Sequence, residues 1–261
     1  MDFPLSSQLV NRLDYVDSTG STNTDLIEVA ADRPDLSVLV SGFQTAGRGR
    51  ATGRQWLAPS GSSLAISVLL RPAASHKIAP TSFGWLPLMA GLAMARAVRQ
   101  FIPAEKVAVK WPNDVLVEEK KISGILSELL PDLSGVIIGA GLNLTQTQAE
   151  LPVETATSLA LSGATEFTAD RVLAAYLGEL RALYSPFVDA GGDAEVSGLR
   201  SAVAATCGSI SRRVRAIMPG DQELTGVGVG LDATGRLLIQ PDGERELFAV
   251  AAGDIVHLRH N

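Results

Sequence analysis

The direction of the strands in the central sheet is indicated by the stretch Val107-Ala-Val-Lys-Trp-Pro-Asn-Asp-Val-Leu-Val117 and the residues that follow it. Apolar and β-branched residues predict short strands at Val107–Lys110 and Val115–Val117 and a longer strand at Lys121–Leu130. Glu118–Lys120 is a link of turn length between two of these strands. Because strands joined by tight turns run in opposite directions, we predict that this part of the sheet is antiparallel.

The same kind of pattern continues on both sides of this stretch. Further strands are expected at Gly135–Asn143 downstream, and at Ser37–Phe43 and Ser63–Leu70 upstream. Apolar residues at helical spacing predict two long core helices, over Thr81–Phe101 and Thr168–Val188. Long helices interspersed with strands indicate an α/β (α+β) domain with a mixed, largely antiparallel sheet.

The last fifty residues follow a different pattern. After a break at Asp189–Asp193, short strands from Ser211 onward are separated by turns such as Pro219-Gly-Asp221 and Pro241-Asp-Gly243. This predicts a small five-stranded barrel, and hence two domains, residues 1–208 and 209–261. Gly226-Val-Gly-Val-Gly230 lacks the spacing of a dinucleotide-binding fingerprint and falls within the predicted barrel strands, which indicates a structural role.

Composition restricts the class of protein. The chain has 261 residues, of which 46% are hydrophobic and 19% charged, and its net charge is −6. An acidic chain is a poor general binder of nucleic acid, so basic groups must act locally, and four of the five lysines lie between residues 106 and 121. One cysteine and three histidines argue against a disulfide or a zinc site. With no signal peptide and no long apolar run, we expect a soluble cytoplasmic protein that does not bind membranes.

The loop Gln44-Thr-Ala-Gly-Arg-Gly-Arg-Ala-Thr-Gly-Arg54 is the first candidate for a functional site. It has three glycines, three arginines and no large apolar side chain, so it has little to bury by itself. Glycine permits close approach of the backbone to a ligand, and arginine binds phosphate or carboxylate with two parallel hydrogen bonds. The loop does not match the Walker A motif, because Arg48 and Gly49 stand where lysine and serine or threonine are required. It is either an anion-binding lid or a solvated basic loop.

Two further segments combine polar groups in a way that suits a ligand. The hydroxyl-rich run Ser18–Asp25 precedes an apolar helical pattern, so Ser21 or Thr22 either caps a helix or donates to a ligand. In Lys110-Trp-Pro-Asn-Asp114, the proline fixes the backbone while Lys110, Asn113 and Asp114 project from a strand end. A carboxylate beside an amide suits Mg²⁺, although a tight turn with an Asx hydrogen bond would use the same residues.

Two weaker signals lie in the following strands. Lys121 opens an apolar strand three residues before Gly124, where it is either an edge charge or a cation for a ligand. Gly139-Ala-Gly-Leu-Asn143 ends a strand with small residues, which leaves space for a flat ring that Asn143 could contact, or simply forms a turn.

These motifs, in this order, resemble those of the biotin protein ligases. The matching pieces are Gly20–Asn23, Gln44–Arg50, Lys110–Asp114, Lys121–Leu126 and Gly139–Asn143, together with a tail at Ala252–Arg259 that is similar to that family's C-terminal barrel. The resemblance implies a catalytic domain like that of class II aminoacyl-tRNA synthetases and biotin–lipoate ligases, followed by an SH3-like barrel. One departure is an extra residue in the arginine loop at Ala51-Thr52, which puts the role of Arg54 in doubt.

The resemblance also implies an activity and a set of site residues. Biotin would be activated by ATP to biotinyl-5′-AMP, with Mg²⁺, and transferred to a lysine of a biotin carboxyl carrier protein domain. The implied biotin-binding residues are Ser21, Thr22, Asn23, Gln44, Gly47, Arg48, Arg50, Lys121 and Gly124; those for ATP are Arg50, Arg54, Trp56, Lys110, Asn113 and Asn143. The implied catalytic residues are Arg48, Arg50, Lys121 and Asp114, with Asp114 also the metal ligand, and Arg259 is a candidate in the barrel.

Two alternatives differ from this reading in substrate or in class. A lipoate or octanoyl transferase of related fold resembles the chain less, because that group lacks the Gly-Arg-Gly-Arg loop paired with Lys-Trp-Pro-Asn-Asp. A biotin-responsive DNA-binding repressor would need an N-terminal helix-turn-helix domain, and residues 1–17 are too few to form one. We therefore expect a monofunctional ligase that does not bind nucleic acid.

Overall fold

The computed structural model describes residues 1–50, 53–72, 78–220, 222–251 and 253–258. A seven-stranded sheet runs in the order β1-β2-β3-β7-β6-β5-β4. Its strands are β1 (Arg12–Val16), β2 (Ser37–Ser41), β3 (Ser63–Leu70), β4 (Val107–Lys110), β5 (Asp114–Val117), β6 (Lys120–Leu129) and β7 (Val136–Asn143). Within the described chain β1 pairs with β2 in parallel and the other neighbours are antiparallel, which confirms the predicted mixed, largely antiparallel sheet.

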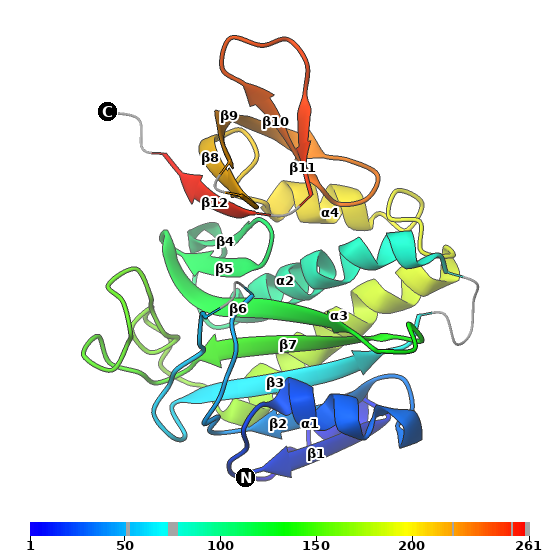
Figure 1. Ribbon diagram of the computed structural model, residues 1–261. Coiled ribbons are helices and arrows are strands. Elements are labelled where there is room, and N and C mark those ends of the chain that lie inside the picture. Colours follow the sequence, from blue (N-terminus) through cyan, green and yellow to red (C-terminus); the bar gives the residue numbers. More distant parts are fainter. Residues whose placement is uncertain (51–52, 73–77, 221, 252, 259–261) are drawn as a thin grey trace.

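Helices cover both faces of this sheet, and the strand alternation shows why. In β3, Leu64, Ile66 and Val68 point into the main core, which also contains α2 (Trp85–Val98) and α3 (Ala169–Asp189). Leu69 points the other way and packs in a second cluster with α1 (Thr22–Glu28). Figure 1 shows α1 in front of the sheet and α2 and α3 behind it. The central strands are therefore buried on both faces.

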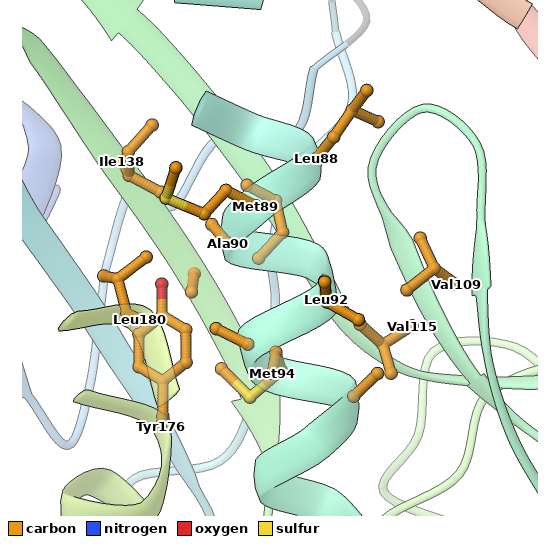
Figure 2. Close-up of a cluster of buried hydrophobic side chains, with 14 of the residues drawn as sticks. Leu88, Met89, Ala90, Leu92, Met94, Val109, Val115, Ile138, Tyr176 and Leu180 are labelled. Atoms are coloured by element: carbon orange, nitrogen blue, oxygen red, sulfur yellow. The ribbon is translucent and has the colours of Figure 1, made fainter. Parts of the chain in front are cut away.

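The helix α2 is the centre of the main core. Its alanine, leucine and methionine side chains are buried almost all the way round the helix, because it lies between the sheet and α3 (Figure 2). Met89 lies beside Ile138 of β7, and Met94 lies on the side of α2 that faces Tyr176 of α3. Each buried leucine or methionine side chain contributes about 1.5–3 kcal/mol, so this helix is a major source of stability.

The C-terminal residues form a five-stranded antiparallel sheet, which confirms the five short strands predicted there; the closure of this sheet into a barrel stays a prediction. Its order is β11-β10-β9-β8-β12, from β8 (Arg213–Met218), β9 (Gln222–Leu231), β10 (Leu237–Pro241), β11 (Phe248–Val250) and β12 (Asp254–His257). Two tryptophans tie it to the larger domain: Trp111 Nε1 donates to Gly235 O and Trp85 Nε1 donates to Ala233 O, both at 2.9 Å. A Cβ on Gly228 would lie 2.1 Å from Ser209 O, so this glycine is needed for close packing of two backbones.

Three elements differ from the prediction. Residues 1–17 contain the edge strand β1, which the mixed composition concealed because its side chains are mostly only half-buried. The short helix α4 (Leu199–Thr206) was not predicted. The helix expected to begin at Thr81 begins at Trp85, after a 3-10 turn over Pro80–Gly84. The exact position of the domain boundary near residue 209 stays a prediction.

Within the described ranges, we find no helix of the length and apolarity needed to cross a membrane.

Candidate active site

A cavity opens on the face of the sheet that carries α1. Toward one end of this face Leu39, Leu69 and Ile137 are large and pack against the helix. Toward the other end, the positions on this same face of the strands carry small residues, so no large side chains fill the space above the sheet there. The cavity is lined by Ser21, Thr22, Asn23, Gln44, Arg48, Gly49, Arg50, Trp56, Ala65, Ile66, Asn113, Lys121, Gly124, Ile125, Leu126, Gly139, Ala140 and Gly141. It therefore gathers residues from five of the motifs identified in the sequence.

The hydroxyl groups at the start of α1 face this cavity instead of capping the helix. Ser21 occupies the N-cap position with extended backbone, but within the described structure its side chain makes no capping hydrogen bond. The backbone N–H of Thr22 donates to Gln44 Oε1 at 2.8 Å, so an amide from the arginine loop caps the helix. Thr22 Oγ1 donates to the same oxygen of Gln44 at 3.1 Å, so neither hydroxyl caps the helix although both residues line the cavity, which favours the binding interpretation of this motif.

Behind these hydroxyls lies a continuous polar network. Ser67 Oγ lies 2.8 Å from Thr22 Oγ1 and 2.6 Å from Asn23 Oδ1. Asn23 Nδ2 donates to Glu128 Oε2 at 2.7 Å, and Arg48 Nη2 lies 3.0 Å from the same oxygen. Thr22, Asn23 and Ser67 are all buried, so the floor of the cavity is polar yet shielded from water.

The arginine loop is folded back on itself and bridges the two domains. Gly49 N donates to Arg54 O and Trp56 N donates to Gly47 O, which closes the described parts of the loop into a short antiparallel pairing. Arg50 and Arg54 each place Nη2 2.6 Å from a carboxylate oxygen of Asp254 in β12. The extra residue at Ala51-Thr52 lies outside the described residues, as does Arg259.

Trp56, at the end of this loop, lies flat against β7 beside the cavity. A Cβ built on Gly141 would lie 2.3 Å from Trp56 Cε2, so only glycine allows the indole to approach this closely. The neighbouring Gly124 is similarly crowded by Lys121, whose Nζ lies 6.0 Å from the centroid of the indole ring. The flat ring expected against these small residues is, in this structure, a side chain of the protein itself.

Lys121 connects this cavity with a second one. Its ammonium forms an ion pair with the carboxylate of Asp114, with Nζ 2.6 Å from Oδ1. The second cavity is lined by Lys110, Asp114, Leu116, Glu119, Lys121, Thr155, Arg212, Val256, His257 and Leu258. Of the described residues, Lys121 alone lines both cavities.

The two predicted asparagines have different surroundings. Asn113 lines the first cavity and donates from Nδ2 to Ile125 O at 3.1 Å. Asn143 is buried; its amide donates to Thr157 O and accepts from Gln146 Nε2, both at 2.9 Å. Each polar atom of Asn143 has one partner within the protein, which leaves one N–H and one lone pair of the amide for a further contact. Its role stays a prediction.

A second polar cluster lies where the two domains meet. His257 Nε2 is 2.9 Å from Ser209 Oγ, and His257 Nδ1 is 2.9 Å from Arg212 Nη1. Burial lowers the pKa of His257 below its usual value of 6.5, although Glu119 opposes this effect. Because Arg212 can only donate, Nδ1 is an acceptor and the neutral ring carries its proton on Nε2. Ser209 Oγ also accepts from Trp111 N, so this cluster touches the Lys110–Asp114 motif.

Several of these residues were absent from the sequence prediction. Ser67 is one small residue within an apolar strand, and Asp254 becomes significant only through its contact with a loop two hundred positions earlier. Glu128 carried a weak signal, since it is a carboxylate within the otherwise largely apolar stretch Ile122–Leu130. In the described ranges no group of three or more His, Cys, Asp or Glu side chains is placed to hold a metal.

Comparison with known proteins agrees with this architecture. Residues 15–143 match the model of the biotin/lipoate A/B protein ligase family, and residues 210–258 match that of the biotin protein ligase C-terminal domain. The chain is 38% identical over 252 residues to a biotin–[acetyl-CoA-carboxylase] ligase of Mycobacterium tuberculosis, which covers 95% of this chain and 90% of the relative. It is 34% identical over 227 residues to the bifunctional ligase/repressor BirA of Escherichia coli, covering 85% and 67%.

The same similarity holds among solved structures. The biotin protein ligase from Aquifex aeolicus in complex with biotin and ATP superposes with a TM-score of 0.77 and 28% identity, covering 96% of this chain and all of that one. The chain belongs to the biotin protein ligase family, which confirms the resemblance found in its motifs.

Proposed function

We propose that this protein is an ATP-dependent ligase that attaches biotin to a lysine of a biotin carboxyl carrier protein domain, as in acetyl-CoA carboxylase. In the first step, a carboxylate oxygen of biotin attacks the α-phosphorus of ATP and pyrophosphate leaves, giving biotinyl-5′-AMP. In the second step, the ε-nitrogen of the carrier lysine attacks the acyl carbon, loses a proton and displaces AMP. The names of the similar ligase and of the complex with biotin and ATP support this assignment.

The position of Lys121 is the observation that carries the proposal. The reaction must bring together two anions, a carboxylate and a phosphate, and needs a cation between them. Lys121 Nζ stands where the cavity with the polar floor meets the second cavity, which also contains Lys110 and Arg212. We place biotin in the first cavity, the phosphates toward the second, and the reacting groups at the ammonium of Lys121.

The polar floor selects the substrate class. The ring of biotin is a urea that needs both donors and acceptors, and Thr22, Gln44 and Ser21 offer both. An octanoyl chain or the dithiolane of lipoate has no hydrogen-bonding group, so it would cover the polar groups of Ser21, Thr22 and Gln44 that line the cavity without replacing their contacts with water. The floor therefore favours biotin over lipoate.

The arginines would hold the acid end of biotin and the phosphates. Arg48 and Arg50 line the cavity, and each uses only Nη2 in its hydrogen bonds to described residues. A guanidinium has five N–H donors, so both side chains keep donors for an anion. Gly47, Gly124, Asn23, Trp56, Arg54 and Asn143 complete the proposed biotin and ATP contacts.

Asp114 fits a magnesium ion that arrives with the nucleotide. Mg²⁺ is usually held by one or two carboxylates together with phosphates and waters, and Asp114 offers one carboxylate at the second cavity. Its Oδ1 is ion-paired with Lys121 Nζ at 2.6 Å, so the ammonium would turn from this oxygen toward the phosphate when the ion binds. When bound, the ion would neutralise charge on the leaving pyrophosphate. Asp114 would then hold the metal while its neighbour Lys121 faces the α-phosphate.

We also propose that the reaction takes place in the cytoplasm, where ATP and carrier domains occur, and that the protein does not bind operator DNA. Its net charge of −6 argues against an electrostatic footprint on DNA. A salt-sensitive affinity for a specific DNA sequence at nanomolar level, measured by fluorescence anisotropy, would contradict this.

The direct test incubates the protein with ATP and Mg²⁺ and either biotin or lipoate, and follows adenylate and carrier mass by mass spectrometry. We expect a biotin adduct on the carrier lysine and none with lipoate. Lys121→Met should lower the rate of adenylate formation by about 10²–10³-fold, the usual effect of losing one charge-stabilising donor. The exposed neighbour Lys120 provides the control, Lys120→Met, which should retain activity. Modification with lipoate alone would refute the proposal.

A further inference from the structure

We propose that Glu119 is a positioning residue, which Arg212 holds so that the β5–β6 hairpin directs Lys121 toward the substrates. Glu119 lies at the tip of this hairpin, and Arg212 precedes β8 of the C-terminal sheet. The inference rests on the proposed function, in which Lys121 is the cation between the carboxylate of biotin and the α-phosphate of ATP. Glu119 therefore acts on the reaction only through Lys121.

The turn at the tip of the hairpin has an unfavourable sequence. Val117 pairs with Lys120, so the link between β5 and β6 is two residues long. These residues, Glu118 and Glu119, have φ angles of 48° and 67°. A two-residue turn with both φ angles positive is usually Asn-Gly or Asp-Gly, because most other side chains are strained there. Two glutamates in such a turn need contacts that offset the strain.

Each glutamate has a partner, but the two partners lie in different parts of the molecule. Glu118 forms an ion pair with Lys106, which precedes the neighbouring strand β4. Glu119 accepts a hydrogen bond of 2.6 Å from Arg212 Nη1, where the two domains meet. The same nitrogen lies 2.9 Å from His257 Nδ1, and the side chain of His257 is only 10% exposed. Glu119 is therefore tied to a shielded part of the C-terminal domain, whereas Glu118 is tied locally.

The strand after the turn shows why this tie matters for Lys121. Leu116 pairs with Lys121 and Val115 pairs with Ser123, so Ile122 is an extra residue on β6. Such a bulge interrupts the ladder of hydrogen bonds and lets the strand bend. The bulge separates Lys121 from the regular part of β6, so the direction of Lys121 depends on the turn that precedes it.

The other support of Lys121 is a single bridge. Lys121 N donates to Thr155 O at 2.7 Å, and Thr157 N donates to Lys121 O at 2.8 Å. The segment that makes this bridge is irregular, so the hairpin tip and one bridge together fix the backbone of Lys121. A displacement of about 1 Å at a catalytic group can cost up to about 100-fold in rate. Loosening the tip should therefore slow the reaction without emptying the biotin cavity.

The test compares two changes in the same turn, Glu119→Gly and Glu118→Gly. Glycine suits a positive φ, so both changes relieve the strain, but only Glu119→Gly removes the tie to Arg212. In Glu119→Gly, kcat for biotinyl-AMP formation should fall about 10-fold, while Kd for biotin without ATP, measured by calorimetry, changes by less than about 2-fold. Glu118→Gly should keep both wild-type values. In Glu119→Gln the amide oxygen still accepts from Arg212, so the loss in kcat should be only about 3-fold.

A double variant shows whether the effect passes through Lys121. In the Lys121→Met protein, adding Glu119→Gly should lower the remaining rate by less than about 2-fold, because the residue that Glu119 positions is gone. A further loss of about 10-fold in that background would mean that Glu119 acts elsewhere, and would overturn the proposal. Equal kcat in the two glycine variants would overturn it as well.

Hydrogen–deuterium exchange tests the tie without any chemistry. The amide of Lys121 should exchange about 10-fold faster in Glu119→Gly than in Glu118→Gly, because a loosened tip opens its hydrogen bond to Thr155 more often. Equal exchange in the two variants would overturn the proposal whatever the activity. If the exchange differs as expected but the wild-type protein forms no biotinyl-AMP, the tie stands, while the proposed function and the part of Glu119 in it are overturned.

Discussion

Replacing Asp254 by asparagine should release the arginine loop from the C-terminal sheet. The carboxylate of Asp254 holds two guanidinium groups, Arg50 through Oδ1 and Arg54 through Oδ2, each at 2.6 Å. Arg50 also donates to Gly253 O, and that hydrogen bond survives the change. The variant therefore removes the charge from the contact while keeping the shape of the side chain.

The magnitude follows from the exposure of the partners. The side chains of Arg50 and Asp254 are 29% and 32% exposed, so after allowance for solvent their charge-assisted hydrogen bond contributes about 1–1.5 kcal/mol. The side chain of Arg54 is 66% exposed, and its pair contributes about 0–0.5 kcal/mol. Together they stabilise the closed loop by about 1.5 kcal/mol, which corresponds to a change of about 10-fold in loop opening.

Hydrogen–deuterium exchange provides the measurement. The amides of Gly49 and Trp56 are hydrogen-bonded only when the loop is closed, so their exchange should be about 10-fold faster in Asp254→Asn. Asp242→Asn is the control, because it breaks an exposed ion pair with Arg213 in the same sheet without touching the loop. Unchanged exchange at the loop in Asp254→Asn, or equal acceleration in both variants, would refute the idea that this ion pair holds the loop closed.

Three further predictions concern the cavity and the domain junction. Gly141→Ala should push Trp56 off β7 and weaken biotin binding about 10-fold or more, because the added Cβ would lie 2.3 Å from the indole. Titration calorimetry would measure the affinity, and tryptophan fluorescence would report the displaced indole. Wild-type affinity would contradict the packing argument. Trp111→Phe leaves the buried carbonyl of Gly235 without its donor and should lower the free energy of unfolding in urea by about 1–3 kcal/mol; a change within error would mean that this contact does not couple the domains. Burial lowers the pKa of His257, so unfolding below pH 6.5 takes up a proton. The contribution of His257 to the free energy of unfolding should therefore be complete above pH 6.5. It should decline as the pH falls through 6.5 toward the lower pKa of the folded state. Urea titrations from pH 5 to 8 should show this slope in the wild type and a smaller one in His257→Gln; an equal slope would assign it to other groups.

The strands and long helices could be predicted from sequence because their patterns are local. Val107–Lys110 and Ser63–Leu70 were predicted with the bounds that the structure shows, and Thr168 is the N-cap of the helix expected there. Periodicity reports which side chains are buried, and turn residues report where the chain reverses. Both signals are weak for a half-exposed edge strand such as β1, which is why it was missed.

The candidate site divides in the same way. Motifs of unusual composition identified the loop with Arg48 and Arg50, the hydroxyls before α1, and Lys121. From sequence alone, each of these motifs could bind a ligand or could serve only the structure, because the same residue types are used for both. Their convergence on a single cavity is what favours the ligand role.

By itself, the sequence determined the order of the long helices and buried strands, the family and the residue types available for chemistry, since these depend on composition and local spacing. Only the tertiary structure decided which of those residues meet. It brought Asp254 to the arginine loop, placed Ser67 between Thr22 and Asn23, and set Lys121 between two cavities. The reason is physical: these contacts join positions far apart in the chain, and their geometry follows from strand register and domain docking, which no local pattern records.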